Sequence, residues 1–153
     1  MKKKTANGIV SDGNDEWDID YAGLEKALNS KTRAIIVNSP HNPIGKVFSN
    51  DELSRVAKLL EKHPQVVVIE DNVYEGITFD DMYNKPLPKM AYQPGMRDRC
   101  IGCYSAGKIF EATGIRSGWV ISSPTLIRAM RSVHQFNMYC QYNVVENTIT
   151  RCL

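Results

Sequence analysis

Long hydrophobic runs are absent from this sequence, and the longest nearly uncharged stretches, such as Val66–Ile69, have only the length of a β-strand. A membrane-spanning helix needs about 20 apolar residues, so we expect none. The basic cluster Lys2–Lys4 has no apolar segment behind it, which argues against a secretory signal. The four cysteines are therefore expected to be reduced thiols of an intracellular protein, with the cytoplasm favoured over the mitochondrion.

Excess charge and residues that break regular structure are also scarce. Nineteen Lys and Arg balance 17 Asp and Glu, and a net charge of +2 is too small to indicate a nucleic-acid or membrane partner. Ten Gly and seven Pro in 153 residues lie far below the level of low-complexity chains. With 42% hydrophobic residues, the chain has the composition of a globular protein and room for one domain of typical size.

Four short segments have the pattern of β-strands. Arg33–Asn38 is β-branched and apolar, and it is followed by Pro40 and Pro43, which exclude a helix. Gln65–Asp71 is apolar until its last two residues, which predicts a fully buried strand. Cys100–Tyr104 and Arg116–Ser122 are the other two candidates.

Helical patterns lie between and after these strands. The clearest begins at Ser49 and Glu52, which form a capping box, and its apolar residues recur at helical spacing up to Lys62. The other expected helices are Tyr21–Leu28 capped by Asp20, Pro124–Phe136 capped by Ser123, and a segment from Tyr142 to Leu153.

Strands alternating with helices predict an α/β fold with a mostly parallel sheet. In such sheets, ligands bind beyond the carboxyl ends of the strands. Those ends carry three polar clusters, Asn38–Asn42, Asp71–Tyr74 and the predicted tight turn Ser105–Lys108. The long irregular segment Thr78–Arg99 is also typical of a functional loop. The sequence therefore predicts a ligand site at this edge.

The residues at this edge resemble those of the class I, fold-type-I aminotransferases that depend on pyridoxal 5′-phosphate (PLP). The resemblance rests on Asn38–Lys46, Asp71–Tyr74 and Ser105–Trp119, in the family's order. Two further segments, Pro86–Met90 and His134–Asn137, look most like the kynurenine and glutamine transaminases, whose relatives include cysteine-conjugate β-lyases. The resemblance implies a three-layer α/β/α fold and exchange of an amino group between an amino acid and a 2-oxo acid.

The resemblance implies catalytic roles for Lys108, Asp71 and Tyr74. A PLP enzyme needs a lysine that holds the cofactor as a Schiff base and moves the substrate's α-proton, and Lys108 matches it. Asp71 ends an apolar strand, where a carboxylate needs a partner, and a pyridinium nitrogen is a suitable one. Glu70 should point to the opposite face of the strand. Taken singly, an exposed lysine or a loop carboxylate would be the simpler reading.

The remaining cofactor-binding residues follow from the same resemblance. Asn42 and Tyr74 would donate hydrogen bonds to the phenolic oxygen of the ring, although Asn42 before a proline also fits simple turn chemistry. Ser105 and Arg116 would hold the phosphate, for which the forked guanidinium is well suited.

A phosphate-binding loop is a lower-ranked alternative. Gly102–Lys108 matches the first seven positions of a nucleotide-binding loop, but Ile109 stands where Ser or Thr should bind magnesium. That interpretation leaves Asp71 and Arg116 unexplained.

A metal site has little support. Cys100 and Cys103 have zinc-like spacing but should face opposite sides of a strand, and no second ligand pair is suitably spaced, so packed thiols are expected. The other candidate ligands are scattered through the sequence: His41, His63, His134, Cys140 and Cys152.

Members of the family are more than twice this long. We expect a tail or irregular segment at 1–16 and a partial PLP-binding large domain, truncated at both ends, at 17–153. The substrate-binding arginine and the aromatic residue that stacks on the ring are not identifiable, so a catalytically incomplete PLP-binding fragment is a second hypothesis. A partial sheet exposes edges and apolar surface, which predicts poor independent stability, and the full-length form is expected to be a homodimer.

Overall fold

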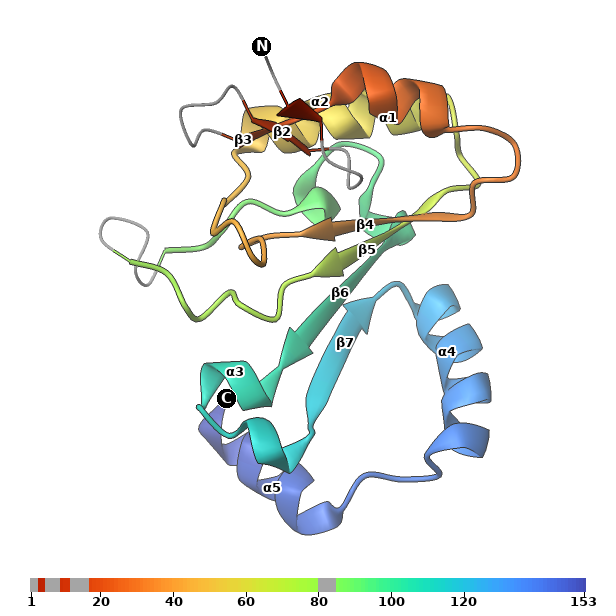
Figure 1. Cartoon of the computed structure of the whole chain (residues 1–153). Helices are drawn as coiled ribbons and strands as arrows, with labels where there is room; N and C mark the ends of the chain where they lie inside the picture. Colours follow the sequence, from red (N-terminus) through yellow and green to blue (C-terminus); the bar gives the residue numbers. More distant parts are fainter. Residues whose placement is uncertain (1–2, 5–8, 12–16, 80–84) are drawn as a thin grey trace.

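The computed structural model describes residues 3–4, 9–11, 17–79 and 85–153 and contains two sheets (Figure 1). The smaller sheet is antiparallel and consists of β1 (Lys3–Lys4), β2 (Ile9–Ser11) and β3 (Trp17–Ile19). Two of its strands lie within 1–16, where a tail or irregular segment is expected, and the rest of that segment lies outside the described residues. The domain boundaries remain a prediction.

The larger sheet positions the candidate site. Its strands are β4 (Ala34–Asn38), β5 (Val67–Asp71), β6 (Cys100–Ser105) and β7 (Gly118–Ser122), in that spatial order. β4, β5 and β6 are parallel, whereas β7 runs antiparallel to β6. The predicted α/β fold with a mostly parallel sheet is therefore confirmed.

In Figure 1, α1 and α2 lie above the larger sheet, α4 lies to the right of β7, and α5 lies at the bottom of the view. The described helical elements are α1 (Tyr21–Ala27), α2 (Asn50–Glu61), η2 (Met90–Tyr92), η3 (Arg97–Arg99), α3 (Ala106–Ile109), η4 (Thr113–Ile115), α4 (Pro124–Asn137) and α5 (Asn143–Cys152). Among the residues described, no helix combines the length and the apolar character needed to cross a membrane.

Local capping signals account for the starts of two helices. The Ser49 hydroxyl accepts a hydrogen bond from Glu52 N at 3.2 Å, and the Glu52 carboxylate accepts one from Ser49 N at 2.8 Å, which is the predicted capping box. Asp20 caps α1 by accepting from Gly23 N at 3.0 Å. Ser123 is the N-cap residue of α4 and Pro124 begins the helix, as predicted, but the Ser123 hydroxyl makes no capping hydrogen bond and donates instead to the carbonyl of Asp98.

The hydrophobic core lies on one face of the sheet, under α2. Leu53, Val56 and Leu60 of α2 are buried against Val68 of β5 and Cys100 of β6. The prediction that β5 is buried on both faces is wrong, since its burial alternates residue by residue. The physical reason is that the core cluster packs against only one face of the strand.

Candidate active site

The loop after β4 is tied to the end of β5 by the side chain of Asn38. Its amide nitrogen donates to the carbonyl oxygens of Asp71 at 2.9 Å and Pro40 at 3.1 Å, and its amide oxygen accepts from Asn42 N at 2.8 Å. The peptide bonds before Pro40 and Pro43 are cis. Asn38 therefore places Asn42 beside the strand end that carries Asp71, a role that the sequence analysis did not assign to it.

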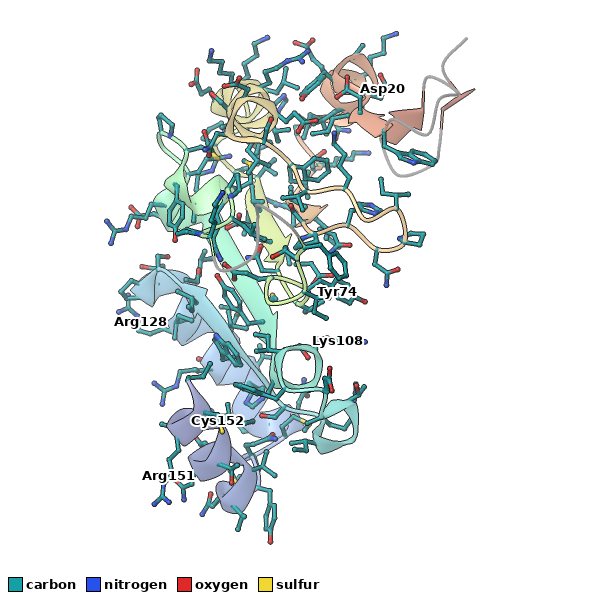
Figure 2. The ribbon with its side chains drawn as sticks, turned by 90° about the vertical axis from the view of Figure 1, so that its left-hand side faces the viewer. Asp20, Tyr74, Lys108, Arg128, Arg151 and Cys152 are labelled. Atoms are coloured by element: carbon teal, nitrogen blue, oxygen red, sulfur yellow. The ribbon has the colours of Figure 1, made fainter. Side chains whose placement is uncertain are left out.

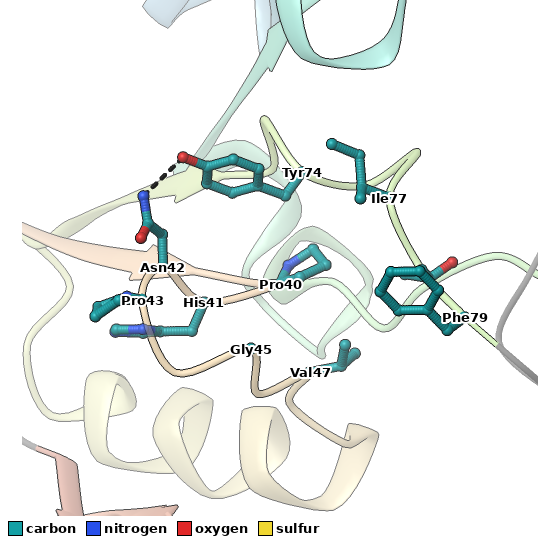
Figure 3. A pocket seen from close by; sticks show the side chains of 10 residues that line it. Pro40, His41, Asn42, Pro43, Gly45, Val47, Tyr74, Ile77 and Phe79 are labelled. Atoms are coloured by element: carbon teal, nitrogen blue, oxygen red, sulfur yellow. Dashed lines mark hydrogen bonds between the residues drawn. The ribbon is translucent and has the colours of Figure 1, made fainter. Parts of the chain in front are cut away.

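Asn42 and Tyr74 meet directly across this edge. Asn42 Nδ2 donates to the Tyr74 hydroxyl at 2.7 Å, as Figure 3 shows. Tyr74 lies in the turn that follows β5, where Glu75 N donates to Asn72 O at 3.0 Å. Two polar clusters predicted from separate strands are thus in contact.

Lys108 reaches the same place from the third strand. Its Nζ lies 5.5 Å from the centroid of the Tyr74 ring, and Figure 2 shows the two residues next to each other. The prediction of a tight turn at Ser105–Lys108 is wrong, because Ser105 is the last residue of β6 and Lys108 belongs to the single-turn helix α3. Ala106 and Gly107 are buried at the start of α3. Packing of these two residues therefore fixes the backbone from which the Lys108 side chain extends.

The antiparallel pairing of β6 and β7 brings Ser105 close to the segment that carries Arg116. Ser105 pairs with Gly118, and Ala106 N donates to Ser117 O at 3.1 Å. A Cβ atom at position 118 would lie 2.3 Å from Tyr104 O, so this approach requires glycine.

Arg116 lies outside β7, contrary to the predicted strand Arg116–Ser122. Its backbone is left-handed, with φ of 55° and ψ of 43°, directly after η4. The side chain is exposed, and one guanidinium nitrogen is 3.4 Å from the carbonyl oxygen of Thr113. The pairing of β7 with β6 therefore starts only at Gly118. Arg116 lies next to the end of the sheet and is not part of it.

Asp71 and Glu70 face opposite sides of β5, as predicted. Asp71 is half-buried on the face shared with Asn38 and Cys103, its neighbours in the sheet register. Glu70 is 3% exposed and accepts hydrogen bonds from the backbone N–H groups of Met90 and Ala91. Burial raises the pKa of Glu70. Glu70 therefore anchors η2, and Asp71 is the carboxylate on the face of β5 that also carries Asn38 and Cys103.

A cavity of about 420 Å³ opens beside the Asn42–Tyr74 hydrogen bond (Figure 3). Its walls are mostly apolar: Pro40, His41, Asn42, Pro43, Gly45, Val47, Tyr74, Ile77, Thr78 and Phe79. His41 Nδ1 is buried without a hydrogen-bond partner, and burial lowers the pKa of this imidazole. The cavity thus shares two residues with the predicted site, while Asp71, Ser105, Lys108 and Arg116 lie outside its walls.

The alternative of a nucleotide-binding loop does not fit this geometry. Gly102–Ser105 continue β6 as extended chain paired with β7, and Gly102 and Cys103 also pair with β5, so this stretch is not a loop whose amides form a nest around phosphate. Cys100 and Cys103 alternate in burial along the strand, and burial raises the pKa of the Cys100 thiol to about 12. Within the described ranges, no group of three or more His, Cys, Asp or Glu side chains could hold a metal ion.

Comparison with known proteins identifies the family. Residues 6–146 match the family described as aminotransferase class I and II. Kynurenine–oxoglutarate transaminase of Dictyostelium discoideum is 43% identical over 121 residues, covering 78% of this chain and 27% of that protein. Human kynurenine–oxoglutarate transaminase 3 is 44% identical over 124 residues, covering 81% of this chain and 26% of that protein.

A solved structure agrees with this assignment. N-succinyldiaminopimelate aminotransferase from Mycobacterium tuberculosis superposes with a TM-score of 0.77 at 37% sequence identity, over 86% of this chain and 33% of that protein. The chain spans about a quarter of the length of the curated relatives it matches. The family match extends over most of the chain and includes every residue of the candidate site. The chain belongs to the class I and II aminotransferase family.

Proposed function

We propose that this chain carries the cofactor-binding part of a PLP-dependent aminotransferase. The observation that carries the proposal is the placement of Lys108 Nζ 5.5 Å from the Tyr74 ring, whose hydroxyl accepts a hydrogen bond from Asn42. When bound, PLP supplies an electron sink that stabilises negative charge at the α-carbon of an amino acid. An amine, a carboxylate and two hydrogen-bond donors at one sheet edge are the groups that such a ring requires.

Each residue has a separate task in this proposal. Lys108 would hold the cofactor through its amine and then move a proton at Nζ. The Asp71 carboxylate would keep a proton on the ring nitrogen. Asn42 and Tyr74 would donate hydrogen bonds to the phenolic oxygen.

The phosphate would be held by residues at the end of β6 and in the connection to β7. Ser105 offers a hydroxyl at the end of β6, and its side chain does not cap α3. Arg116 offers a guanidinium that is exposed and only weakly engaged, by the Thr113 carbonyl at 3.4 Å. Arginine suits this task because its fork can donate two parallel hydrogen bonds to one anion.

The relatives supply the substrate hypothesis. Because the matched curated proteins are named kynurenine–oxoglutarate transaminases, we infer kynurenine as amino donor and 2-oxoglutarate as acceptor. A homodimer is the expected assembly of the full-length form. The four free cysteines are compatible with a reducing compartment, and we favour the cytoplasm over the mitochondrion.

The proposal is tested by adding PLP to the purified chain. We expect visible absorbance from lysine-bound cofactor, which Lys108→Ala removes, while Lys58→Ala, at an exposed position on α2, retains it. A wild-type chain without such absorbance would contradict the proposal, as would an unchanged spectrum in Lys108→Ala.

Turnover separates two versions of the proposal. Production of glutamate from kynurenine and 2-oxoglutarate would show a working aminotransferase. Cofactor binding without turnover would instead support the second hypothesis, a catalytically incomplete fragment, which the coverage of about a quarter of each relative favours.

A further inference from the structure

A buried lysine next to the candidate site has no role in the proposed function. Lys89, just before η2, is 8% exposed, and its ammonium group lies 2.7 Å from Glu75 Oε2 and 3.0 Å from the Tyr104 hydroxyl. The same nitrogen is 4.8 Å from the centroid of the Tyr104 ring. Burial alone would lower the pKa of Lys89, but the hydrogen bonds to Glu75 and Tyr104 outweigh burial and raise it. A buried, charged lysine is thus held by two partners.

The two partners are the chain neighbours of site residues. Glu75 follows Tyr74 in the turn after β5, and Tyr104 precedes Ser105 at the end of β6. Tyr104 is itself fixed, since its ring stacks on Trp119 with centroids 5.6 Å apart and an interplanar angle of 7°. Lys89 therefore joins the two elements that carry the two halves of the candidate site.

The backbone at Lys89 is anchored as well. The next two residues, Met90 and Ala91, donate their N–H groups to the buried carboxylate of Glu70. Glu70 precedes Asp71 on β5, so the lysine extends from a point fixed to the strand that leads to the site. Because the backbone at Lys89 is fixed and its ammonium group is paired, this side chain can fix the position of Glu75 relative to the sheet. An ion pair at the surface would contribute little to stability.

We propose that Lys89 is a positioning residue, which holds the turn bearing Tyr74 at a set distance from the helix bearing Lys108. Without Lys89, the side chain of Tyr74 would depend on the hydrogen bond from Asn42, an exposed residue, and on the contact of its ring with Lys108. Only the test with bound PLP rests on the proposed function. The placement of the turn can be measured without PLP.

The cofactor-free test is hydrogen exchange of the turn amides in the full chain. Glu75 N donates to Asn72 O at 3.0 Å and Ile77 N to Tyr74 O at 2.9 Å. We expect Lys89→Met to lower the protection of both amides by about tenfold, since a hydrogen bond to a charged group is lost. Lys89→Arg should restore protection, and Lys85→Met, at an exposed position in the same segment, should leave it unchanged. Unchanged protection in Lys89→Met would overturn the proposal.

The cofactor test follows the pH dependence of the visible absorbance with bound PLP. A displaced Tyr74 would donate less well to the phenolic oxygen, so Lys89→Met should raise the midpoint of this titration, in the same direction as Tyr74→Phe. Glu75→Gln should do the same, and the effects of Lys89→Met and Glu75→Gln should not add, because the two side chains act as one pair. Additive effects, or a midpoint equal to wild type in Lys89→Met, would contradict the proposal.

Two further outcomes distinguish failure of the proposed PLP-binding function from failure of the positioning role of Lys89. If the wild-type chain binds no PLP, the proposed function fails, and hydrogen exchange alone decides the role of Lys89. If Lys89→Met does not fold, Tyr104→Phe removes only one of the two partners of the lysine. This milder variant should lower turn protection in the same direction, and protection equal to wild type would overturn the proposal.

Discussion

The helices α2 and α4 have similar amphipathic patterns but different surroundings. α2 buries Leu53, Val56, Ala57 and Leu60 against the sheet, whereas α4 contains no fully buried residue. Val133, an apolar residue of α4, is 61% exposed. An amphipathic pattern thus predicts that a helix forms, while the amount of chain packed against it decides how much of its apolar face is buried.

The same contrast separates the two sides of the larger sheet. Ile35 and Val37 of β4 pack against the core, but Ile36 between them is 70% exposed. On β7, Val120 is 43% and Ile121 is 60% exposed. The candidate site lies between the well-packed strands β4 and β5 and the strand β7, whose Val120 and Ile121 are exposed. The predicted low stability of the chain remains to be measured.

The largest expected difference between the two regions is in thiol reactivity. Cys100 lies in the core under α2, and burial, together with the charge of Glu70, raises its pKa to about 12. Cys152 is exposed at the end of α5. Because the thiolate is the reactive form, iodoacetamide at pH 8 should modify Cys152 at least about a thousandfold faster than Cys100.

Mass spectrometry of tryptic peptides over time measures both thiols in one sample. Urea serves as the control, since unfolding exposes both cysteines and should bring their rates together. Comparable rates in the native chain would show that the core under α2 opens as readily as the C-terminal helix.

The second prediction compares the same kind of truncation in α2 and α4. Leu60 is 0% exposed, so Leu60→Ala should lower the free energy of unfolding by about 2–5 kcal/mol, through lost burial and the cavity left behind. Val133→Ala, at an exposed position, should lower it by less than about 0.5 kcal/mol. Urea unfolding followed by circular dichroism measures both. Equal losses would mean that α4 is covered in solution, for example by a second copy of the chain.

The smallest effects are expected at the helix starts. Ser49→Ala removes one half of the capping box of α2 and should cost about 1 kcal/mol of stability. Ser123→Ala, at a position whose side chain makes no cap bond to α4, should cost less. Urea unfolding measures both variants. If Ser49→Ala and Ser123→Ala lower the urea midpoint equally, the assignment of the capping box is contradicted.

The capping box of α2 should also depend on pH. Burial alone would raise the pKa of Glu52, but hydrogen bonds from Lys46 and Ser49 outweigh burial and lower it. A lowered pKa means that Glu52 stabilises the fold above its unfolded value of 4.5 and loses this effect as the pH falls through its folded pKa. The stability gap between wild type and Glu52→Gln should therefore narrow below about pH 4.5, and a constant gap would contradict this assignment.

Sequence reasoning succeeded where the physical cause is local. The capping box at Ser49 and the cap at Asp20 depend on side chains three residues from their partners, so the sequence contains all of the necessary information. The convergence of Asn42, Tyr74 and Lys108 was predicted from the parallel strand order and the family resemblance. Their contacts agree with that prediction, whereas their catalytic roles await the proposed experiments.

Sequence reasoning failed where distant segments decide the local structure. Arg116 reads as the start of a strand, but the ladder with β6 begins only at Gly118. Lys108 reads as part of a turn, although burial of Ala106 and Gly107 supports a helical turn there. No local signal marks Lys89 as buried, because a lysine after two prolines is ordinarily exposed.

By itself, the sequence determined the order of the four strands of the larger sheet and of α1, α2, α4 and α5, the caps of α1 and α2, and the edge of the sheet at which polar side chains gather. These features follow from side-chain periodicity, capping and strand direction, each of which acts over a few residues. Only the tertiary structure decided that Glu70 anchors η2, that Lys89 joins Glu75 to Tyr104, and that one face of the sheet is covered. Those features depend on contacts between residues far apart in the chain, which burial and charge pairing select only once the whole chain is packed.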